Sequence, residues 1–321
     1  MNLLRQHSRG PSAARVLAWT AGALGALALV NHVLAGRAER RHPPEGRFIE
    51  VDGVRLHYSD RGTGRPVVLI HGNMVTGDDY DTSGVADLLR AGHRVIIFDR
   101  PGFGHSERPR GRMWTAAEQA GLLHEALRQL GIERPVVVGH SWGAIVALAF
   151  ADRYPTDTAG LVLLSGYYFP TLRPDVLLVG IAAIPVLGDV LRYTLSPVFG
   201  WLTMPLVKRA LFSPARIPER FTEEFSPAMA LRPSQLRATA GDGALMIPGV
   251  LALQHRYGML SMPVTIIAGD GDKVVFKRSA ERLHRSIRGS RLRIVSGAGH
   301  MVHHLEARLV AKSIAEIAAA T

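Results

Sequence analysis

Short apolar runs alternate with amphipathic stretches along most of the chain. Six runs rich in Val, Ile or Leu have the length and continuity of strands buried on both faces of a sheet: 67–72, 94–99, 135–140, 160–166, 263–269 and 291–297. The stretches between them place apolar residues at helical spacing and predict helices at 79–91, 115–130, 141–154, 279–287 and from 302 onward. Residues 47–59 alternate around Asp52-Gly53, which predicts a β-hairpin.

This order of strands and helices predicts an α/β fold with a mostly parallel central sheet and helices on both faces. The rhythm lapses at 167–258, which holds ten of the 19 prolines together with long apolar pieces. We interpret 47–166 and 259–321 as one core, and 167–258 as a helical cap inserted over the carboxyl edge of the sheet. A second membrane-associated segment is the alternative for 167–258, but proline interrupts its apolar pieces too often for them to span a bilayer.

The first 46 residues form a separate unit. Residues 16–36 carry no charge, and arginines lie on both sides of them, at 5, 9, 15, 37, 40 and 41. At 1.5 Å per residue a helix of this length spans about 30 Å, the hydrocarbon thickness of a bilayer. We therefore expect a single-pass transmembrane helix followed by a polar linker at 37–46. A secretory signal that is cleaved after export is the alternative, and the balanced arginines leave the orientation open.

Composition narrows the function classes. The 321 residues include no cysteine, which excludes disulfides, thiolate metal sites and a cysteine nucleophile. The net charge is +11, with seven arginines against two glutamates in residues 1–47 and the remaining excess dispersed along the chain. Because no basic stripe with aromatic neighbours occurs, the sequence argues against a nucleic-acid partner.

One short stretch joins the third apolar run to the helix after it: Gly139-His140-Ser141-Trp142-Gly143. A G-x-S-x-G pattern between a buried strand and a helix is typical of a nucleophile elbow, a sharp turn that lifts the serine hydroxyl above the sheet. We predict that Ser141 is the nucleophile. The similar Gly-His-Ser at 104–106 lacks the second glycine and the apolar helix, so we expect Ser106 to be a loop residue.

A serine nucleophile needs a base to take its proton and an acid to orient that base. The last two apolar runs are followed by candidates for both groups, in the chain order Ser, Asp, His that this fold uses. We predict His300 as the base and Asp272 as the acid. Asp270 is the weaker candidate for the acid because it is better placed to cap the turn. His303 and His304 are the weaker candidates for the base, one turn into the following helix.

The negative charge that develops on a substrate carbonyl oxygen needs two preorganised N–H donors. We predict the amide of Trp142 as one donor, and the backbone N–H of Asn73, in the loop after the first buried run, as the other. Met74 is the alternative to Asn73. His71 and Asp99-Arg100 are expected to brace loops and to take no part in the chemistry.

These residues resemble the α/β-hydrolase family from about Phe48 to the carboxyl terminus. The resemblance rests on five motifs in order: HGN (71–73), DRPGFGHS (99–106), GHSWG (139–143), GDGD (269–272) and GAGH (297–300). It implies the same assignment of Ser141, Asp272 and His300, and a cap where the strand pattern lapses. Asn73 with Trp142 is similar to the halide-binding pair of haloalkane dehalogenases. Those enzymes and the epoxide hydrolases use an aspartate nucleophile, so the serine here argues against both activities.

The leading hypothesis is a serine hydrolase that cleaves carboxylic esters of a lipophilic substrate through an acyl-enzyme intermediate. Within the same fold, the alternatives are a haloperoxidase-like enzyme or a carbon–carbon bond hydrolase, for which Arg173 and Arg192 are candidates to hold a substrate carboxylate. A catalytically silent, membrane-tethered binding protein is the alternative of another class.

No cofactor or metal is expected. His303, His304 and Glu306 offer metal-binding atoms, but no H-E-x-x-H spacing occurs and adjacent histidines on a helix are expected to point in different directions. The membrane, through the N-terminal helix, and the small-molecule ester are the expected partners. The sequence leaves the oligomeric state and the identity of the ester open.

Overall fold

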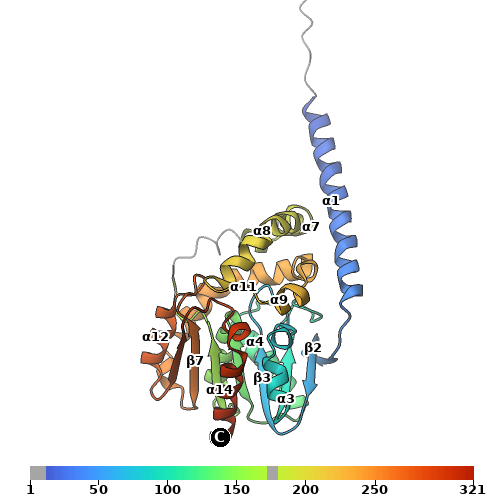
Figure 1. Ribbon diagram of the computed structural model, residues 1–321. Helices are drawn as coiled ribbons and strands as arrows, with labels where there is room; N and C mark the ends of the chain where they lie inside the picture. The colour runs from blue at the N-terminus through green and yellow to red at the C-terminus, as the bar shows by residue number, and fades with distance from the viewer. Residues whose placement is uncertain (1–11, 172–179) are drawn as a thin grey trace, which may run out of the picture.

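An eight-stranded sheet organises the part of the chain that the computed structural model describes, residues 12–171 and 180–321 (Figure 1). Its strands, in spatial order, are β1 (Arg47–Val51), β2 (Val54–Arg61), β4 (His93–Phe98), β3 (Arg65–Ile70), β5 (Val136–His140), β6 (Gly160–Leu164), β7 (Val264–Gly269) and β8 (Arg291–Val295). β1 and β2 form the predicted hairpin, β2 pairs antiparallel with β4, and all other pairs are parallel. The predicted fold class is confirmed.

Helices cover both faces of the sheet, because alternate side chains of each buried strand point to opposite sides. Val68 and Ile70 of β3 pack in the core beneath α4 (Ala116–Gln129), α5 (Trp142–Arg153) and α12 (Lys277–Ser286). Val67 and Leu69 pack in a second core beneath α3 (Val85–Arg90) and α14 (Ala307–Ala320). Continuous apolar strands are therefore what a sheet buried on two sides requires.

Two predicted helices are each divided in the structure. The stretch 79–91 forms α2 (Asp79–Thr82) and α3, separated at Gly84, whose φ of 79° is left-handed and ends a helix. The terminal stretch forms α13 (Val302–Leu305) and α14, with Glu306 between them at a non-helical φ of −129° and ψ of 47°. The prediction of single helices was wrong at these two places because the apolar pattern continues across the breaks.

Between β6 and β7 the chain forms a group of helices that lies over the sheet (Figure 1). They are η1 (Ile181–Ala183), α7 (Leu187–Tyr193), α8 (Leu195–Phe212), α9 (Glu219–Glu224), α10 (Pro227–Ala230), α11 (Pro233–Leu253) and η2 (Tyr257–Met259). These elements occupy the stretch that we interpret as the cap. Residue Arg173, one of the two candidates to hold a carboxylate, lies outside the described residues.

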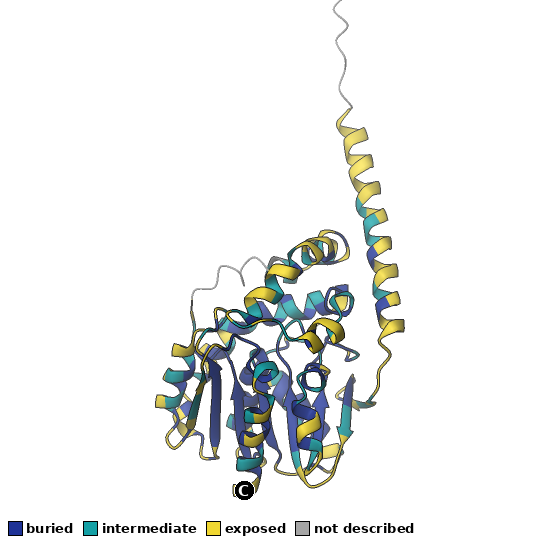
Figure 2. Ribbon diagram, viewed as in Figure 1, coloured by how far each residue is buried: buried dark blue, intermediate teal, exposed yellow. Residues whose placement is uncertain are grey.

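The N-terminal helix α1 (Ala13–Arg41) is long and apolar enough to cross a membrane, a test that signal sequences also pass. Most of its surface is exposed, as Figure 2 shows. The helix continues through residues 37–41, so the expected linker is reduced to 42–46. Arg, Ala and Glu at these positions favour helix, Ala38 is buried, and the helix ends before Pro43-Pro44.

Candidate active site

Ser141 lies in a tight turn between β5 and α5, with φ at 53° and ψ at −115°. A positive φ strains any residue other than glycine. The two glycines of the motif allow this turn because a Cβ on either would collide with backbone. On Gly139 it would lie 2.3 Å from the carbonyl oxygen of Gly143, and on Gly143 it would lie 2.2 Å from that of Ile70. The local sequence thus holds Ser141 at the amino end of α5.

Three side chains from distant parts of the chain form one hydrogen-bonded series at the carboxyl edge of the sheet. The Nε2 atom of His300 lies 2.9 Å from Ser141 Oγ, and its Nδ1 atom lies 2.8 Å from Asp272 Oδ2. The other carboxylate oxygen, Asp272 Oδ1, accepts hydrogen bonds of 2.8 Å from the N–H groups of Val274 and Val275. With Nδ1–H bound to the carboxylate, Nε2 faces the serine as an acceptor.

The weaker candidates lie elsewhere. Asp270 accepts hydrogen bonds from Ser296 Oγ and from the N–H of Gly297, so it closes an exposed turn beside β8. Ser106 is buried in a loop, where its Oγ donates to Asp99 O at 2.7 Å and accepts from the N–H of His57. Neither side chain belongs to the series that contains Ser141.

The loop after β3 lies directly against Ser141. A Cβ on Gly72 would be 2.8 Å from His140 Nδ1 and 3.1 Å from Ser141 Cβ, so a side chain there would force these neighbours to move. Asn73 and Met74 follow, and Met74 adopts a positive φ of 70°. On the other side of Ser141, Trp142 is the first residue of α5, and its N–H has no acceptor within the helix. The two predicted donor segments therefore flank the serine.

Arg100 stabilises the loop after β3 through hydrogen bonds. It is fully buried, and it donates to the carbonyl oxygens of His71 and Gly72 and to Asn73 Oδ1 at 2.8–3.1 Å. His71 in turn accepts the backbone N–H of Arg100 on Nε2 at 2.9 Å. Burial and the Arg100 charge lower the pKa of His71 to about 4, so its ring stays neutral and keeps that acceptor. The bracing contacts expected for His71 and Arg100 are present.

Asp242, a residue that the sequence reasoning missed, ties Arg100 to the cap. It lies on α11, is fully buried, and accepts from Arg100 Nη1 at 2.5 Å, Arg108 Nη1 at 2.9 Å and Gln119 Nε2 at 3.2 Å. The sequence offers one indication of this role: Asp242 is the only acidic residue between Glu224 and Asp270. A lone carboxylate in an apolar stretch indicates a buried partner.

A second polar cluster lies beside the first and corrects one expectation. His303 and His304 do not diverge, because their Nε2 atoms both bind the carboxylate of Asp79, at 2.7 and 2.8 Å. Burial alone raises the pKa of Asp79, but the two histidines hold it well below its usual range. The break between α13 and α14 leaves these histidines on a short turn of four residues, where both can reach one acceptor.

The same cluster is the place where the described residues could hold a metal ion. Asp79, His140 and His303 each bring a potential ligand atom within 4.8 Å of the other two. Burial keeps the pKa of His140 well below its usual range, so that ring is neutral. Hydrogen bonds from His303 and His304 already use both oxygens of Asp79. The absence of a metal therefore stays a prediction from the sequence.

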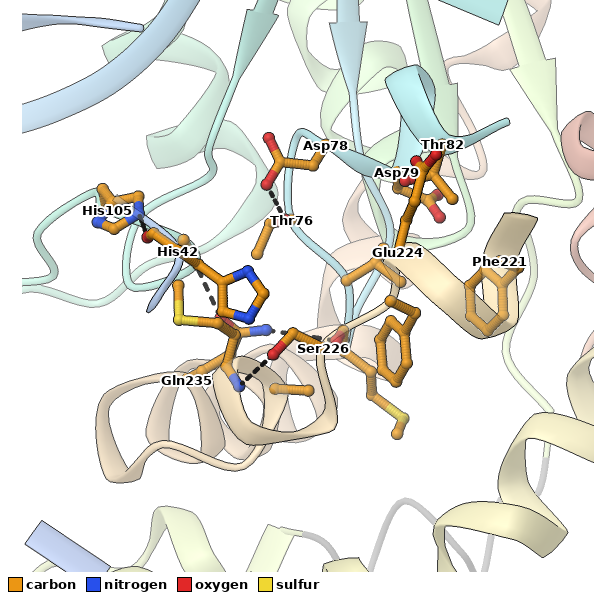
Figure 3. A pocket seen from close by; sticks show the side chains of 16 residues that line it. His42, Thr76, Asp78, Asp79, Thr82, His105, Phe221, Glu224, Ser226 and Gln235 are labelled. Atoms are coloured by element: carbon orange, nitrogen blue, oxygen red, sulfur yellow. Dashed lines mark hydrogen bonds between the residues drawn. The ribbon is translucent and has the colours of Figure 1, made fainter. Parts of the chain in front are cut away.

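A cavity of about 60 Å³ opens between the loop after β3 and the cap, as Figure 3 shows. Gln235 of α11 lines it and ties the two parts together, since it donates to Met74 O and accepts from the N–H of Gly104. Phe221 of α9 closes another side. Ser141, His300 and Asp272 do not line this cavity, so it is separate from the series that contains the serine.

Comparison with known proteins adds three findings. A family profile described as the alpha/beta hydrolase fold matches residues 65–307. The uncharacterized protein Rv2715 of Mycobacterium tuberculosis is 31% identical over 280 residues, which cover 82% of this chain and 77% of that protein. Haloalkane dehalogenase 2 of the same species is 35% identical over 129 residues, which cover 40% of this chain and 44% of that protein.

Among solved structures, a thermophilic esterase from Thermogutta terrifontis superposes with a TM-score of 0.63 and 22% identity. The match covers 84% of this chain and 97% of the esterase. At this level of identity the likeness shows a shared fold, whereas chemistry depends on the side chains around Ser141.

Proposed function

Since this chain belongs to the alpha/beta hydrolase family, we propose that it is a serine hydrolase that cleaves carboxylic esters of lipophilic acyl or alcohol groups. The observation that carries the proposal is the series Ser141 Oγ, His300 and Asp272, with separations of 2.9 and 2.8 Å. A buried imidazole held between a carboxylate and a strained serine has the arrangement needed to activate an alcohol.

In the proposed reaction, Ser141 Oγ attacks the ester carbonyl carbon while His300 Nε2 takes the hydroxyl proton. Asp272 keeps the ring in the required tautomer and stabilises the imidazolium that forms. The N–H groups of Trp142 and Asn73 donate to the carbonyl oxygen as it becomes negative. His300 then gives its proton to the leaving alcohol. Water, deprotonated by the same ring, attacks the acyl-serine, releases the carboxylic acid and restores the serine.

Two other activities of this family fit the site less well, and a haloperoxidase-like activity remains the alternative. Haloalkane dehalogenases resemble this chain through Asn73 and Trp142, but a serine in place of their aspartate gives a stable alkyl ether after displacement and no hydrolysable ester. For carbon–carbon bond cleavage, Arg192 was a candidate to hold a substrate carboxylate. Its guanidinium is almost fully buried and pairs with Asp189, so it is already engaged within the cap.

Activity of the purified full-length protein in detergent tests the proposal. We expect nitrophenyl esters of medium-chain acids to be hydrolysed, and a fluorophosphonate probe to label the protein at one serine. The Ser141→Ala variant should lose both signals. Ser286→Ala, at a half-exposed serine at the end of α12, is the matched control and should keep both. Rapid cleavage of a dienoate diketone with only slow ester turnover would contradict ester specificity, and a folded protein that the probe fails to label would favour a silent binding protein.

We also propose that α1 is retained as a membrane anchor. Its length and apolar composition support this, and the contacts of its last turns with the rest of the protein, such as Glu39 with Arg232 at 2.8 Å, give it a role that a discarded signal would lack. Membrane fractions washed with alkaline carbonate should retain the full-length chain. Recovery of a mature protein that begins after residue 36 would contradict the proposal.

A further inference from the structure

The cap exposes a large apolar surface on α7 and α8. Several of its side chains are mostly exposed, among them Phe199 at 69%, Leu202 at 74% and Leu206 at 73%. No Asp, Glu, Lys or Arg occurs in α8 before Lys208. Soluble monomers rarely leave so many large apolar side chains together in water, so such a surface indicates a partner.

The surface adjoins the exposed apolar side of α1. The amide of Asn31 on α1 donates to the backbone carbonyl oxygens of Tyr193 and Thr194, both at 2.9 Å. These residues form the corner between α7 and α8, where helix ends leave carbonyl groups without helical partners. Leu29 and Val30, next to Asn31, are themselves exposed. Figure 2 shows the exposed residues of α1 and of α7 and α8 at the same end of the molecule.

The position of Asn31 along α1 determines how deep in a membrane the corner between α7 and α8 would lie. Asn31 lies six residues before Arg37, the first charged residue after the apolar stretch, which corresponds to about 9 Å along the helix axis. Arg37, Arg40 and Arg41 belong at the level of the lipid headgroups if α1 spans a bilayer. The corner between α7 and α8 then lies about 9 Å deeper, within the usual depth of an interfacial helix, about 5–10 Å.

Hydrogen bonding at the corner suits that depth. Backbone carbonyl groups in an apolar layer must find donors within the protein. Asn31 supplies two such donors, and the Thr194 hydroxyl is satisfied by donating to Val190 O at 2.6 Å. Arg192 is turned inward to Asp189, which also pairs with the exposed Arg110. Of the large apolar side chains of α7, Leu187, Val190 and Tyr193 are exposed.

We propose that α7 and α8 form a second membrane contact, seated in the interface of the leaflet that α1 enters next to the cap. The far end of α8 touches the site: Leu211 O accepts the backbone N–H of His300 at 2.8 Å and that of Met301 at 3.3 Å. One helix therefore joins the lipid surface to the loop that carries His300. If the protein is an esterase as proposed above, this arrangement assigns its substrate as an ester dissolved in the bilayer.

Tryptophan fluorescence tests the contact directly. Of the four tryptophans, Trp114 and Trp142 are buried in the core, Trp19 lies on α1, and Trp201 lies on α8 with 49% of its surface exposed. Full-length Trp19→Phe protein in phosphatidylcholine vesicles therefore reports Trp201. Lipids brominated near the headgroup end of their acyl chains should quench that emission about twofold. The Trp19→Phe/Trp201→Phe variant is the control and should show almost no quenching.

Two results would overturn the proposal. One is quenching of Trp201 by aqueous iodide but not by brominated lipid, which means that the cap faces water. The other is protection of Trp201 from both quenchers together with cross-links between α8 helices, which means that a second copy of the chain covers the surface.

Activity separates this proposal from the proposed function. Leu202→Lys should lower hydrolysis of a long-chain ester held in vesicles by about three- to tenfold, with hydrolysis of a soluble short-chain ester in detergent unchanged. Leu88→Lys, at an exposed apolar position on α3, should change neither rate. Equal vesicle rates for Leu202→Lys and the parent would contradict entry from the bilayer. If the parent hydrolyses neither ester, the proposed function fails, and the quenching experiment still decides the membrane contact.

Discussion

Substitution of Asp242 by asparagine tests how the cap and the core are held together. The change keeps the size and shape of the side chain, so it opens no cavity. It removes the carboxylate that, among the residues the structure describes, lies within hydrogen-bond distance of both Arg100 and Arg108. The side chains of Arg100 and Asp242 have no exposed surface, and that of Arg108 is only 7% exposed. The variant therefore leaves two guanidinium groups buried without their counter-ion.

Removal of one partner from a buried ion pair typically costs about 3–5 kcal/mol, because the remaining charge stays out of water. We expect the free energy of unfolding of Asp242→Asn to fall by about that amount, a large part of the 5–15 kcal/mol typical of a folded protein. Arg100 also holds the carbonyl oxygen of Gly72 and the side chain of Asn73. We therefore expect kcat for ester hydrolysis to fall, with a smaller change in KM. The fall in kcat should not exceed the roughly 10²–10³-fold cost of losing one oxyanion donor.

Urea titration in detergent, followed by tryptophan fluorescence and circular dichroism, measures the first effect, and nitrophenyl ester kinetics measure the second. Glu125→Gln removes the carboxylate of a solvent-exposed pair with Arg128 and is the control; we expect its urea midpoint to match the parent. An Asp242→Asn protein whose unfolding free energy stays within about 1 kcal/mol of the parent would refute the reasoning, because water or another group would then be stabilising both arginines.

Three further changes test the site. Asp272→Asn should lower turnover by about 10⁴-fold, because His300 loses the carboxylate that orients its ring. The urea midpoint should match the parent, which shows that the fold is retained. Turnover within tenfold of the parent would contradict the role of Asp272 in orienting His300. Gly143→Ala should cost about 1–3 kcal/mol or more because its Cβ would meet Ile70 O at 2.2 Å. Gly249→Ala is its control: the new Cβ would lie 3.9 Å from Ile145 Cγ2, an ordinary contact, so stability should stay equal or rise. His71 has a folded pKa of about 4, below its unfolded value, so the unfolded chain binds more protons between pH 6.5 and 4 and stability is lost as the pH falls. Between pH 7 and 5 this histidine should account for about 2 kcal/mol of the loss, and urea titrations of His71→Gln at both values should show a correspondingly smaller fall; an unchanged fall contradicts a neutral buried ring.

Patterns within short stretches of sequence were enough to predict most of the fold. The six apolar runs correspond to β3 to β8 because a strand buried on both faces can be recognised from its own residues. The break in the apolar run at Ser141 was recognisable from its own residues, although the structure shows that Gly139 is required by a local contact with Gly143 and Gly143 by a contact with Ile70 of the neighbouring strand β3. The loops after β7 and β8 were placed near Ser141 because parallel strands end at one edge of a sheet, and the structure brings Asp272 and His300 together there.

Helix ends were harder to predict than helices. The apolar pattern of 79–91 does not show that Gly84 takes a left-handed conformation and separates two helices. The charged stretch at 37–41 has the composition of a linker, and only its partners in the folded protein show that it is helical. Glu39 pairs with Arg232 and Ala38 is buried, so packing extends α1 by a further turn. Such boundaries depend on surroundings that a single stretch of sequence does not contain.

By itself, the sequence determined the α/β architecture, the elbow at Ser141 and the long apolar helix at the amino end, because each depends on residues close together along the chain. Only the tertiary structure decided which polar groups are paired in the interior. Asp242 meets Arg100 across 142 positions, Asn31 meets Tyr193 across 162, and His303 meets Asp79 across 224. A buried polar group must find a partner wherever folding brings one, and that choice is made by the packing of whole elements.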